Sequence, residues 1–210
     1  MTKRSIIMGF ALAAMFILGW RAMRPVGVGG EPDGEPLRLL WQAPDFEMTA
    51  QNGQAFRNSD LLGNVWVIDF IFTRCPGPCP RMTRQLAALQ KRIPATDPVH
   101  FVSISIDPGF DTPQVLSEYA SRHQVDQSRW HFLSGPVDET VQLVVKGFYT
   151  AVQRGQAEDG LPADPNQIVH GTHFLLVDAQ GRVRGSYDSN DVGVEGKLLQ
   201  DIRRLVADAE

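Results

Sequence analysis

Two cysteines separated by three residues carry the clearest chemistry in this 210-residue sequence. Cys75 and Cys79 stand in the segment Phe72-Thr73-Arg74-Cys75-Pro76-Gly77-Pro78-Cys79-Pro80, and the chain contains no other cysteine. A disulfide between them would close a very small loop and add little stability through chain entropy. The hydrophobic content of 43% is enough for a core without such a cross-link. We therefore expect metal binding or redox chemistry at this pair.

The surroundings of the pair favour thiolates. An apolar run ends just before Cys75, and a helical pattern begins after Pro80. Because prolines suit a loop and the first turn of a helix, Cys75 is expected in the loop and Cys79 at the helix N-terminus, where thiol pKa values fall. Soft sulfur ligands favour Cu(I), Zn(II) or iron–sulfur clusters, but two cysteines alone cannot hold a cluster. The spacing by itself supports a metal site and a metal-free redox pair equally.

A histidine late in the chain is the best third ligand. His170 follows a polar loop, residues 153–168, and directly precedes a buried strand expected at 172–177. In a thioredoxin-type arrangement this junction faces the cysteine turn, so a neutral imidazole there can bind the metal. His173 is the competitor, but it lies an odd number of residues away and should point to the opposite face of the strand. The other histidines fall in ordinary strand or helix patterns: His100, His123 and His131.

Two further residues are candidates for the surroundings of the site. Met82 has a thioether that can bind copper, but it also begins the apolar stripe of the helix, so core packing is the favoured interpretation. Asp107 follows the strand expected at 99–106 and could orient a metal ligand by contacting it from behind, or contact a partner protein. A turn-forming aspartate is an equally supported interpretation of Asp107.

Strands alternate with helices along residues 41–210, which predicts a sheet with parallel elements covered by helices. The sequence therefore predicts an α/β, thioredoxin-like fold with an N-terminal β-hairpin and a long inserted loop before the last hairpin. Functional groups in such sheets gather at the carboxyl ends of the strands. Strands are expected at 46–49, 55–57, 65–72, 99–106, 130–133, 172–177 and 182–187. Helical stripes are expected over 82–93, 116–123, 137–148 and 194–205.

The first 40 residues are predicted to lie outside this domain. Residues 1–24 combine a short basic start with an apolar run, which indicates an uncleaved membrane anchor or a signal peptide. Residues 25–40 are rich in glycine and proline and are expected to form a flexible tether. A single N-terminal helix would place the domain in the periplasm or an equivalent extracytoplasmic space.

Charge is distributed unevenly. The first thirty residues hold four of the 20 basic residues and none of the 24 acidic ones. The remainder therefore has 16 basic and 24 acidic residues, a net charge of −8. Such a domain should not seek nucleic acid or anionic lipid, and it would suit a partner with a basic docking face.

Four stretches together resemble the Sco/SenC family of copper proteins, which assist assembly of the binuclear copper centre of cytochrome c oxidase. The stretches are 72–80, 102–113, 128–135 and 169–178. The resemblance implies that Cys75, Cys79 and His170 bind one copper ion, as Cu(I) or Cu(II), and that the protein is a metallochaperone. It also implies a membrane tether and a copper-accepting oxidase subunit as partner, with other copper chaperones or thiol reductants as further partners.

The sequence departs from the family pattern at two positions. The family often has a basic residue before Asp111, where this chain has Phe110, and usually Ser or Thr after the histidine, where it has Gly171. Neither change removes a ligand, but the glycine predicts a looser histidine loop.

Two enzymatic alternatives remain beside copper delivery. A thiol–disulfide oxidoreductase would use Cys75 or Cys79 to attack a partner disulfide, including one formed by the acceptor's own cysteines. General exchangers carry a cis-proline just before the facing strand, where this chain has Val169-His170-Gly171. A peroxiredoxin-type peroxidase is suggested by Thr73, two residues before Cys75, and is the weaker alternative.

Overall fold

The computed structural model describes residues 36–153 and 168–209. The expected anchor at 1–24 and most of the expected tether fall outside these residues, as does most of the inserted loop. Across the two described ranges, no helix has the length and apolarity needed to cross a lipid bilayer.

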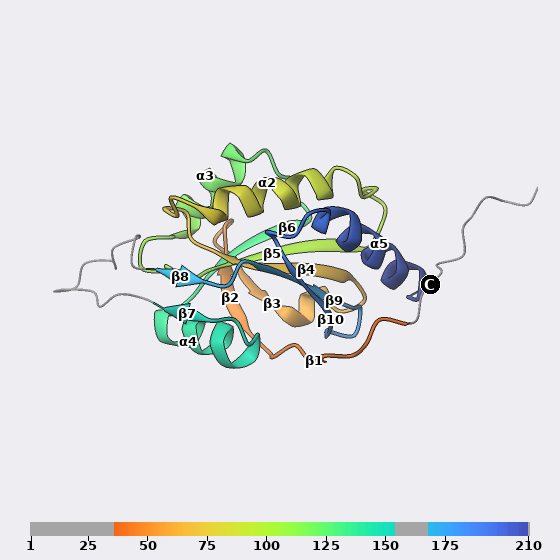
Figure 1. The fold of residues 1–210 in the computed structure, drawn as a ribbon. Helices are drawn as coiled ribbons and strands as arrows, with labels where there is room; N and C mark the ends of the chain where they lie inside the picture. The colour runs from red at the N-terminus through yellow and green to blue at the C-terminus, as the bar shows by residue number, and fades with distance from the viewer. Residues whose placement is uncertain (1–35, 154–167, 210) are drawn as a thin grey trace, which may run out of the picture. The chain divides into compact units, whose positions relative to one another are not determined.

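A mixed β-sheet of eight strands forms the centre of the described domain (Figure 1). Its strand order is β1-β10-β9-β4-β5-β6-β2-β3. β4 runs parallel to β5, which runs parallel to β6, whereas β9 is antiparallel to β4 and β10 is antiparallel to β9. The strands are β1 (Trp41–Gln42), β2 (Glu47–Ala50), β3 (Ala55–Arg57), β4 (Val65–Ile71), β5 (Val99–Ser105), β6 (Trp130–Ser134), β9 (His173–Val177) and β10 (Arg182–Asp188). A separate antiparallel pair consists of β7 (Val152–Gln153) and β8 (Val169–His170).

Strand β4 occupies the middle of the sheet because its side chains are apolar on both faces, with one exception. All seven of its residues are buried, as expected of a strand covered on both sides. The exception is Asp69, a fully buried carboxyl group in an otherwise apolar strand. The carboxyl end of β4 leads directly into the cysteine loop, so the most tightly packed strand positions the candidate site.

The helices cover both faces of the sheet. In Figure 1, α2 and α3 lie above the sheet and α4 lies below it, and α5 contacts α2 and therefore shares its face. Pro78 begins α2 and Pro113 begins α3, where the fixed proline φ suits a first turn. The helices are α2 (Pro78–Gln90), α3 (Pro113–Arg122), α4 (Val137–Gln142) and α5 (Val194–Ala207). The described residues also form a 3-10 helix, η1 (Asn58–Leu61), and a π-helical turn, η2 (Leu143–Gly147).

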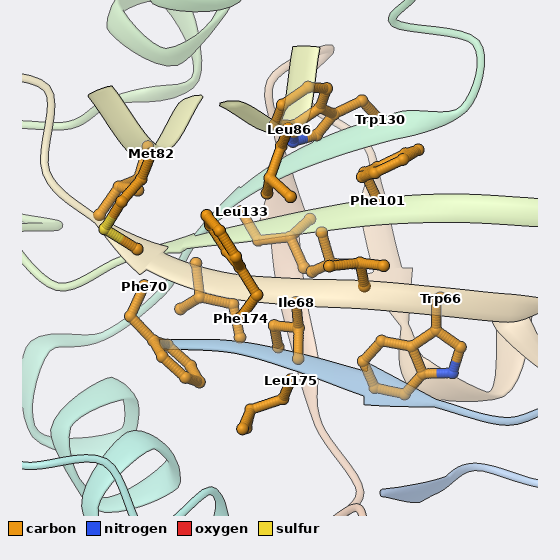
Figure 2. Packing of buried hydrophobic residues seen from close by; sticks show 14 of the residues in the cluster. Trp66, Ile68, Phe70, Met82, Leu86, Phe101, Trp130, Leu133, Phe174 and Leu175 are labelled. Atoms are coloured by element: carbon orange, nitrogen blue, oxygen red, sulfur yellow. The ribbon is translucent and has the colours of Figure 1, made fainter. Parts of the chain in front are cut away.

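The core fills the space between the sheet and the helices. Figure 2 shows Ile68 and Phe70 of β4 pointing away from α2, while Met82 and Leu86 of α2 face the sheet from its other side. All four side chains are essentially inaccessible to solvent. This packing fixes the distance between α2 and the sheet, and so the position of the N-terminus of α2.

Most predicted elements are confirmed, and three details differ. The N-terminal hairpin is β2–β3 and the last hairpin is β9–β10. Strand β1 was not predicted, because two residues give no pattern and the strand forms by pairing with β10, far later in the chain. The helix expected over 137–148 is α4 followed by the wider turn of η2. The junction before β9 contains β8, a short strand that holds His170.

Candidate metal centre

The two cysteines lie where the sequence places them. Cys75 is in the loop after β4, and its backbone N–H donates to the Phe72 carbonyl over 3.2 Å, which closes a tight turn. Cys79 is the second residue of α2, behind Pro78, so its sulfur lies at a helix N-terminus. Cys79 is completely buried and Cys75 is 7% exposed. Cys75 is therefore at the edge of the site, and Cys79 is at its base.

His170 reaches the cysteines from β8, 91 residues after Cys79. Its Nε2 atom lies 3.2 Å from the Cys79 Sγ, and its Nδ1 atom lies 2.9 Å from the Gly171 carbonyl oxygen. Because a carbonyl only accepts, Nδ1 must carry a hydrogen, and in the neutral ring Nε2 is left with a lone pair facing the sulfur. The ring of Phe72 meets the imidazole edge-on at 5.8 Å. The ring is thus oriented from both sides.

One ligand atom from each of Cys75, Cys79 and His170 lies within 4.8 Å of the other two, and all three side chains are buried. Ligands around a four-coordinate soft metal ion lie about 3.5–3.8 Å apart, from metal–ligand distances near 2.0–2.3 Å. The three atoms therefore need only small movements to close around one ion. Two sulfurs and one imidazole suit Cu(I) or Zn(II) and leave a position open to a further ligand.

The two thiols share a proton unequally. A hydrogen bond from the Cys79 thiol lowers the pKa of Cys75 to about 4, with burial opposing the shift and His170 adding to it. The same pairing raises the pKa of Cys79, and burial raises it further. Near neutral pH, Cys75 is a thiolate and Cys79 is a thiol. The Cys75 thiolate is therefore already available as a nucleophile and as a metal ligand.

Comparison with known proteins decides the family. The SCO1/SenC family model matches residues 41–207. The chain belongs to the SCO1/SenC family. The SCO1 protein homolog of Bacillus subtilis is 32% identical over 176 residues, which cover 83% of this chain and 84% of that protein.

Solved structures of the family share the fold. BsSco, a member of the Sco family of cytochrome c oxidase assembly proteins, is 28% identical with a TM-score of 0.68, covering 82% of this chain and 98% of that one. ScoI of Bradyrhizobium japonicum, solved with copper bound, is 24% identical with a TM-score of 0.65, covering 78% and 99% of the two chains. The predicted thioredoxin-like α/β fold is confirmed.

A buried carboxylate holds the cysteine loop of this SCO1/SenC protein in place. Asp111, fully buried before α3, accepts from the Thr73 hydroxyl and from the Ser105 hydroxyl over 2.5 Å each. It also accepts from the Thr73 backbone N–H over 3.1 Å. We call these three residues the Asp111 network. Sequence reasoning missed this role, because the partners are 38 residues apart, and Thr73 was considered only as a peroxidase residue.

A second carboxylate, Asp107, contacts Arg74, the residue just before Cys75. Its carboxylate forms a 2.6 Å ion pair with Arg74, and the Arg74 guanidinium also stacks over the Phe110 ring at 4.3 Å. Phe110, which departs from the family pattern, therefore covers the arginine next to the cysteine loop. The prediction that Asp107 supports the site remains a proposal, now with Arg74 as the group it positions.

Gly171, the second departure from the family pattern, permits a close approach. Its N–H donates to the Ala151 carbonyl over 3.0 Å. A Cβ atom at this position would lie 2.9 Å from the Thr150 Cγ2. In this chain the glycine therefore lets the histidine loop pack tightly against the segment before β7.

The remaining histidines of the described residues are not part of the ligand cluster, and Met82 belongs to the hydrophobic core. His173 is exposed at the start of β9, whereas His170 is buried at the end of β8, so the two histidines lie on separate strands rather than on two faces of one strand. His100 and His131 pair with each other, ring nitrogens 3.4 Å apart, and His123 packs on Tyr119. Met82 is buried in the core (Figure 2).

Proposed function

We propose that this protein is a copper metallochaperone that binds one copper ion through Cys75, Cys79 and His170. We further propose that it delivers the ion to the binuclear copper site of a cytochrome c oxidase. The observation that supports this most is the 3.2 Å approach of His170 Nε2 to Cys79 Sγ inside a buried cluster that also contains Cys75. Family membership, with a copper-bound member among its solved structures, points to the same ion.

Delivery requires tight binding that an acceptor can reverse. Cys79 is sealed from solvent, whereas Cys75 and His170 are 7% and 9% exposed. An incoming thiolate or imidazole can therefore bind the ion beside Cys75 and His170 before Cys79 dissociates from it. Exchange of ligands one at a time keeps the soft ion coordinated throughout the transfer.

Family membership and charge support a proposal for where the domain works. We propose that residues 1–24 hold the protein at a membrane, with the domain on the extracytoplasmic side and residues 25–40 as tether. The net charge of −8 after residue 30 favours a copper-accepting oxidase subunit with a basic docking face. Other copper chaperones or thiol reductants would supply the ion or keep the cysteines reduced.

A second candidate function rests on the thiolate at Cys75. A preformed nucleophile next to a protonated partner thiol can reduce a disulfide in the acceptor. Cys75 would form a mixed disulfide and release one acceptor thiolate. Cys79, after losing its proton, would then displace the second acceptor sulfur, leaving a Cys75–Cys79 disulfide and a reduced acceptor.

The test is a copper titration of the full chain in detergent, followed by mixing with a purified copper-acceptor domain of an oxidase. We expect one tightly bound Cu(I) per chain and transfer to a reduced acceptor. Transfer to an acceptor whose cysteines are oxidised should require the dithiol form of this protein if the second function also operates. If the protein does not bind copper stoichiometrically but does reduce the acceptor disulfide, delivery is rejected in favour of the reductase.

A further inference from the structure

A buried carboxyl group on the central strand is left unexplained by the copper ligands. Asp69 is on β4, six positions before Cys75, and is 0% exposed. Since its neighbours Ile68 and Phe70 point away from α2 (Figure 2), the alternation of the strand turns Asp69 toward α2, the helix that carries Cys79. A charged residue in the middle of an apolar strand was the sequence signal for this group.

One carboxyl oxygen of Asp69 accepts a hydrogen bond and the other does not. Ser103, its register partner on β5, donates to Oδ1 over 2.6 Å, and Trp130 Nε1 donates to the same Ser103 hydroxyl over 2.9 Å. Because Ser103 already accepts from tryptophan, its single hydrogen goes to Asp69. The Oδ2 atom is buried and has no hydrogen-bond partner. Burial without a donor destabilises the ionised carboxylate more than the neutral acid, so Oδ2 is the oxygen at which a proton is favoured.

The charge of Asp69 is coupled to the ligand cluster. Burial raises its pKa to about 7, while the Ser103 hydrogen bond and the field of His170 oppose that rise. Asp69 in turn contributes to the raised pKa values of Cys79, on α2, and Tyr119, on α3. Tyr119 stays neutral and shares a 2.8 Å hydrogen bond with Thr83. The titratable groups coupled to Asp69 are thus two of the three ligands, His170 and Cys79, and the neutral Tyr119.

A change of copper oxidation state is the event that Asp69 is placed to sense. With two thiolates and a neutral imidazole as ligands, the site is neutral with Cu(II) and carries one negative charge with Cu(I). The added electron would reside in a cluster whose His170 and Cys79 interact electrostatically with Asp69, and charges in such a buried region are weakly screened. Protonation of Asp69 removes the repulsion.

We propose that Asp69 takes up one proton when copper at this site is reduced and releases it when the copper is oxidised. The inference deepens the proposed function and rests on it. The Cu(II) ion gains one electron from a one-electron donor, and the Oδ2 atom of Asp69 gains one proton from solvent, so that total charge inside the domain is unchanged. Above neutral pH this coupling disfavours Cu(I), and below it the reduced, transferable ion is favoured.

The test begins with copper stoichiometry and then follows the reduction potential of the copper-loaded full chain from pH 5.5 to 9. In wild type, the equilibrium constant for reduction should fall with rising pH, by up to about tenfold per unit near the pKa of Asp69. Asp69→Asn should remove this dependence. Asp201→Asn, which alters a buried carboxyl group bonded to Tyr187 instead, should keep it.

Ser103→Ala gives an independent measurement if Asp69→Asn does not fold. This change leaves the Asp69 carboxyl group but removes the hydrogen bond that stabilises its ionised form. The pH range over which the reduction potential changes should therefore move to higher pH. Infrared difference spectra should show a protonated carboxyl band on reduction, absent in Asp69→Asn and shifted in Ser103→Ala. If copper binds with the expected stoichiometry but wild type and both variants share one pH profile, the inference is wrong and the proposed function stands. If no variant binds copper, both fail.

Discussion

Cys79 Sγ and His170 Nε2 approach to 3.2 Å although 91 residues separate them in sequence. The contact joins the N-terminus of α2 to β8, a short strand that pairs with β7 over two residues. The sulfur is fixed by a helix packed on the core, whereas the imidazole is fixed by a short ladder and by the Gly171 carbonyl. The histidine is therefore the ligand whose position the local structure determines least strongly.

Loss of His170 should weaken copper binding far more than loss of His173. Changes to groups that only orient a ligand cost about 10–100-fold in affinity, so His170→Ala should cost about 100-fold or more. His173→Ala, three residues away and exposed, should bind as wild type does. Competition with a Cu(I) chelator measures both. Equal affinity of the two variants would remove His170 from the site.

The local parts of this site could be predicted from the sequence because their signals are local. Prolines beside Cys79 indicate a helix start, and the apolar run before Cys75 indicates a buried strand. The choice of His170 follows from its place at a loop–strand junction, although the structure places His170 and His173 on separate strands, β8 and β9. These arguments need only a few neighbouring residues.

The supporting contacts could not be predicted because each joins distant segments. Thr73 and Asp111 meet only when the loop after β5 folds over the cysteine loop. In the sequence, Asp69 is simply one polar residue in an apolar strand. Its hydrogen-bonded environment depends on Ser103 and Trp130, which come from other strands. The close packing that Gly171 permits depends on Thr150, across the inserted loop.

Cys75 should react as a thiolate in the copper-free, reduced protein. Its pKa of about 4 means that it is ionised at every pH above that value, so its alkylation rate should stay level from pH 6 to 8. Cys79→Ala removes the hydrogen bond that contributes most, so the pKa rises and the rate at pH 6 should fall more than about tenfold. Mass spectrometry of iodoacetamide-treated protein gives the rates.

Cys79→Ser is the matched variant for that measurement, since its hydroxyl can still donate to Cys75. It should keep more of the reactivity at pH 6 than Cys79→Ala. A wild-type rate that climbs steadily between pH 7 and 9 would contradict a lowered pKa.

Gly171→Ala should disturb the histidine loop through one identifiable clash. The new Cβ would lie 2.9 Å from Thr150 Cγ2, so one of the two segments must move. Overpacking of this kind costs about 1–3 kcal/mol, and we expect weaker copper binding because the Gly171 carbonyl orients His170. Thr150→Ser removes Cγ2 and keeps the hydroxyl that donates to Phe148. The double variant should regain most of the lost stability and affinity, and failure to do so would exclude the clash as the cause.

Thr73→Val should destabilise the protein, and Thr73→Ser should not. The Thr73 hydroxyl donates to Asp111 over 2.5 Å, and valine keeps the shape of the side chain while removing that donor. Asp111 Oδ1 would then be buried without its partner, which costs about 1–3 kcal/mol in the free energy of unfolding. Urea denaturation of the copper-free protein measures the difference.

The same pair of variants also separates two roles for Thr73. In the Asp111 network the hydroxyl holds the cysteine loop, so Thr73→Val should speed copper release as well as lower stability. A peroxidase would instead need the hydroxyl for peroxide turnover at Cys75, with stability unchanged. Equal unfolding free energies for Thr73→Val and Thr73→Ser would show that the network contributes little, and would leave the loop held by the Arg74–Asp107 ion pair and the packing of Phe110.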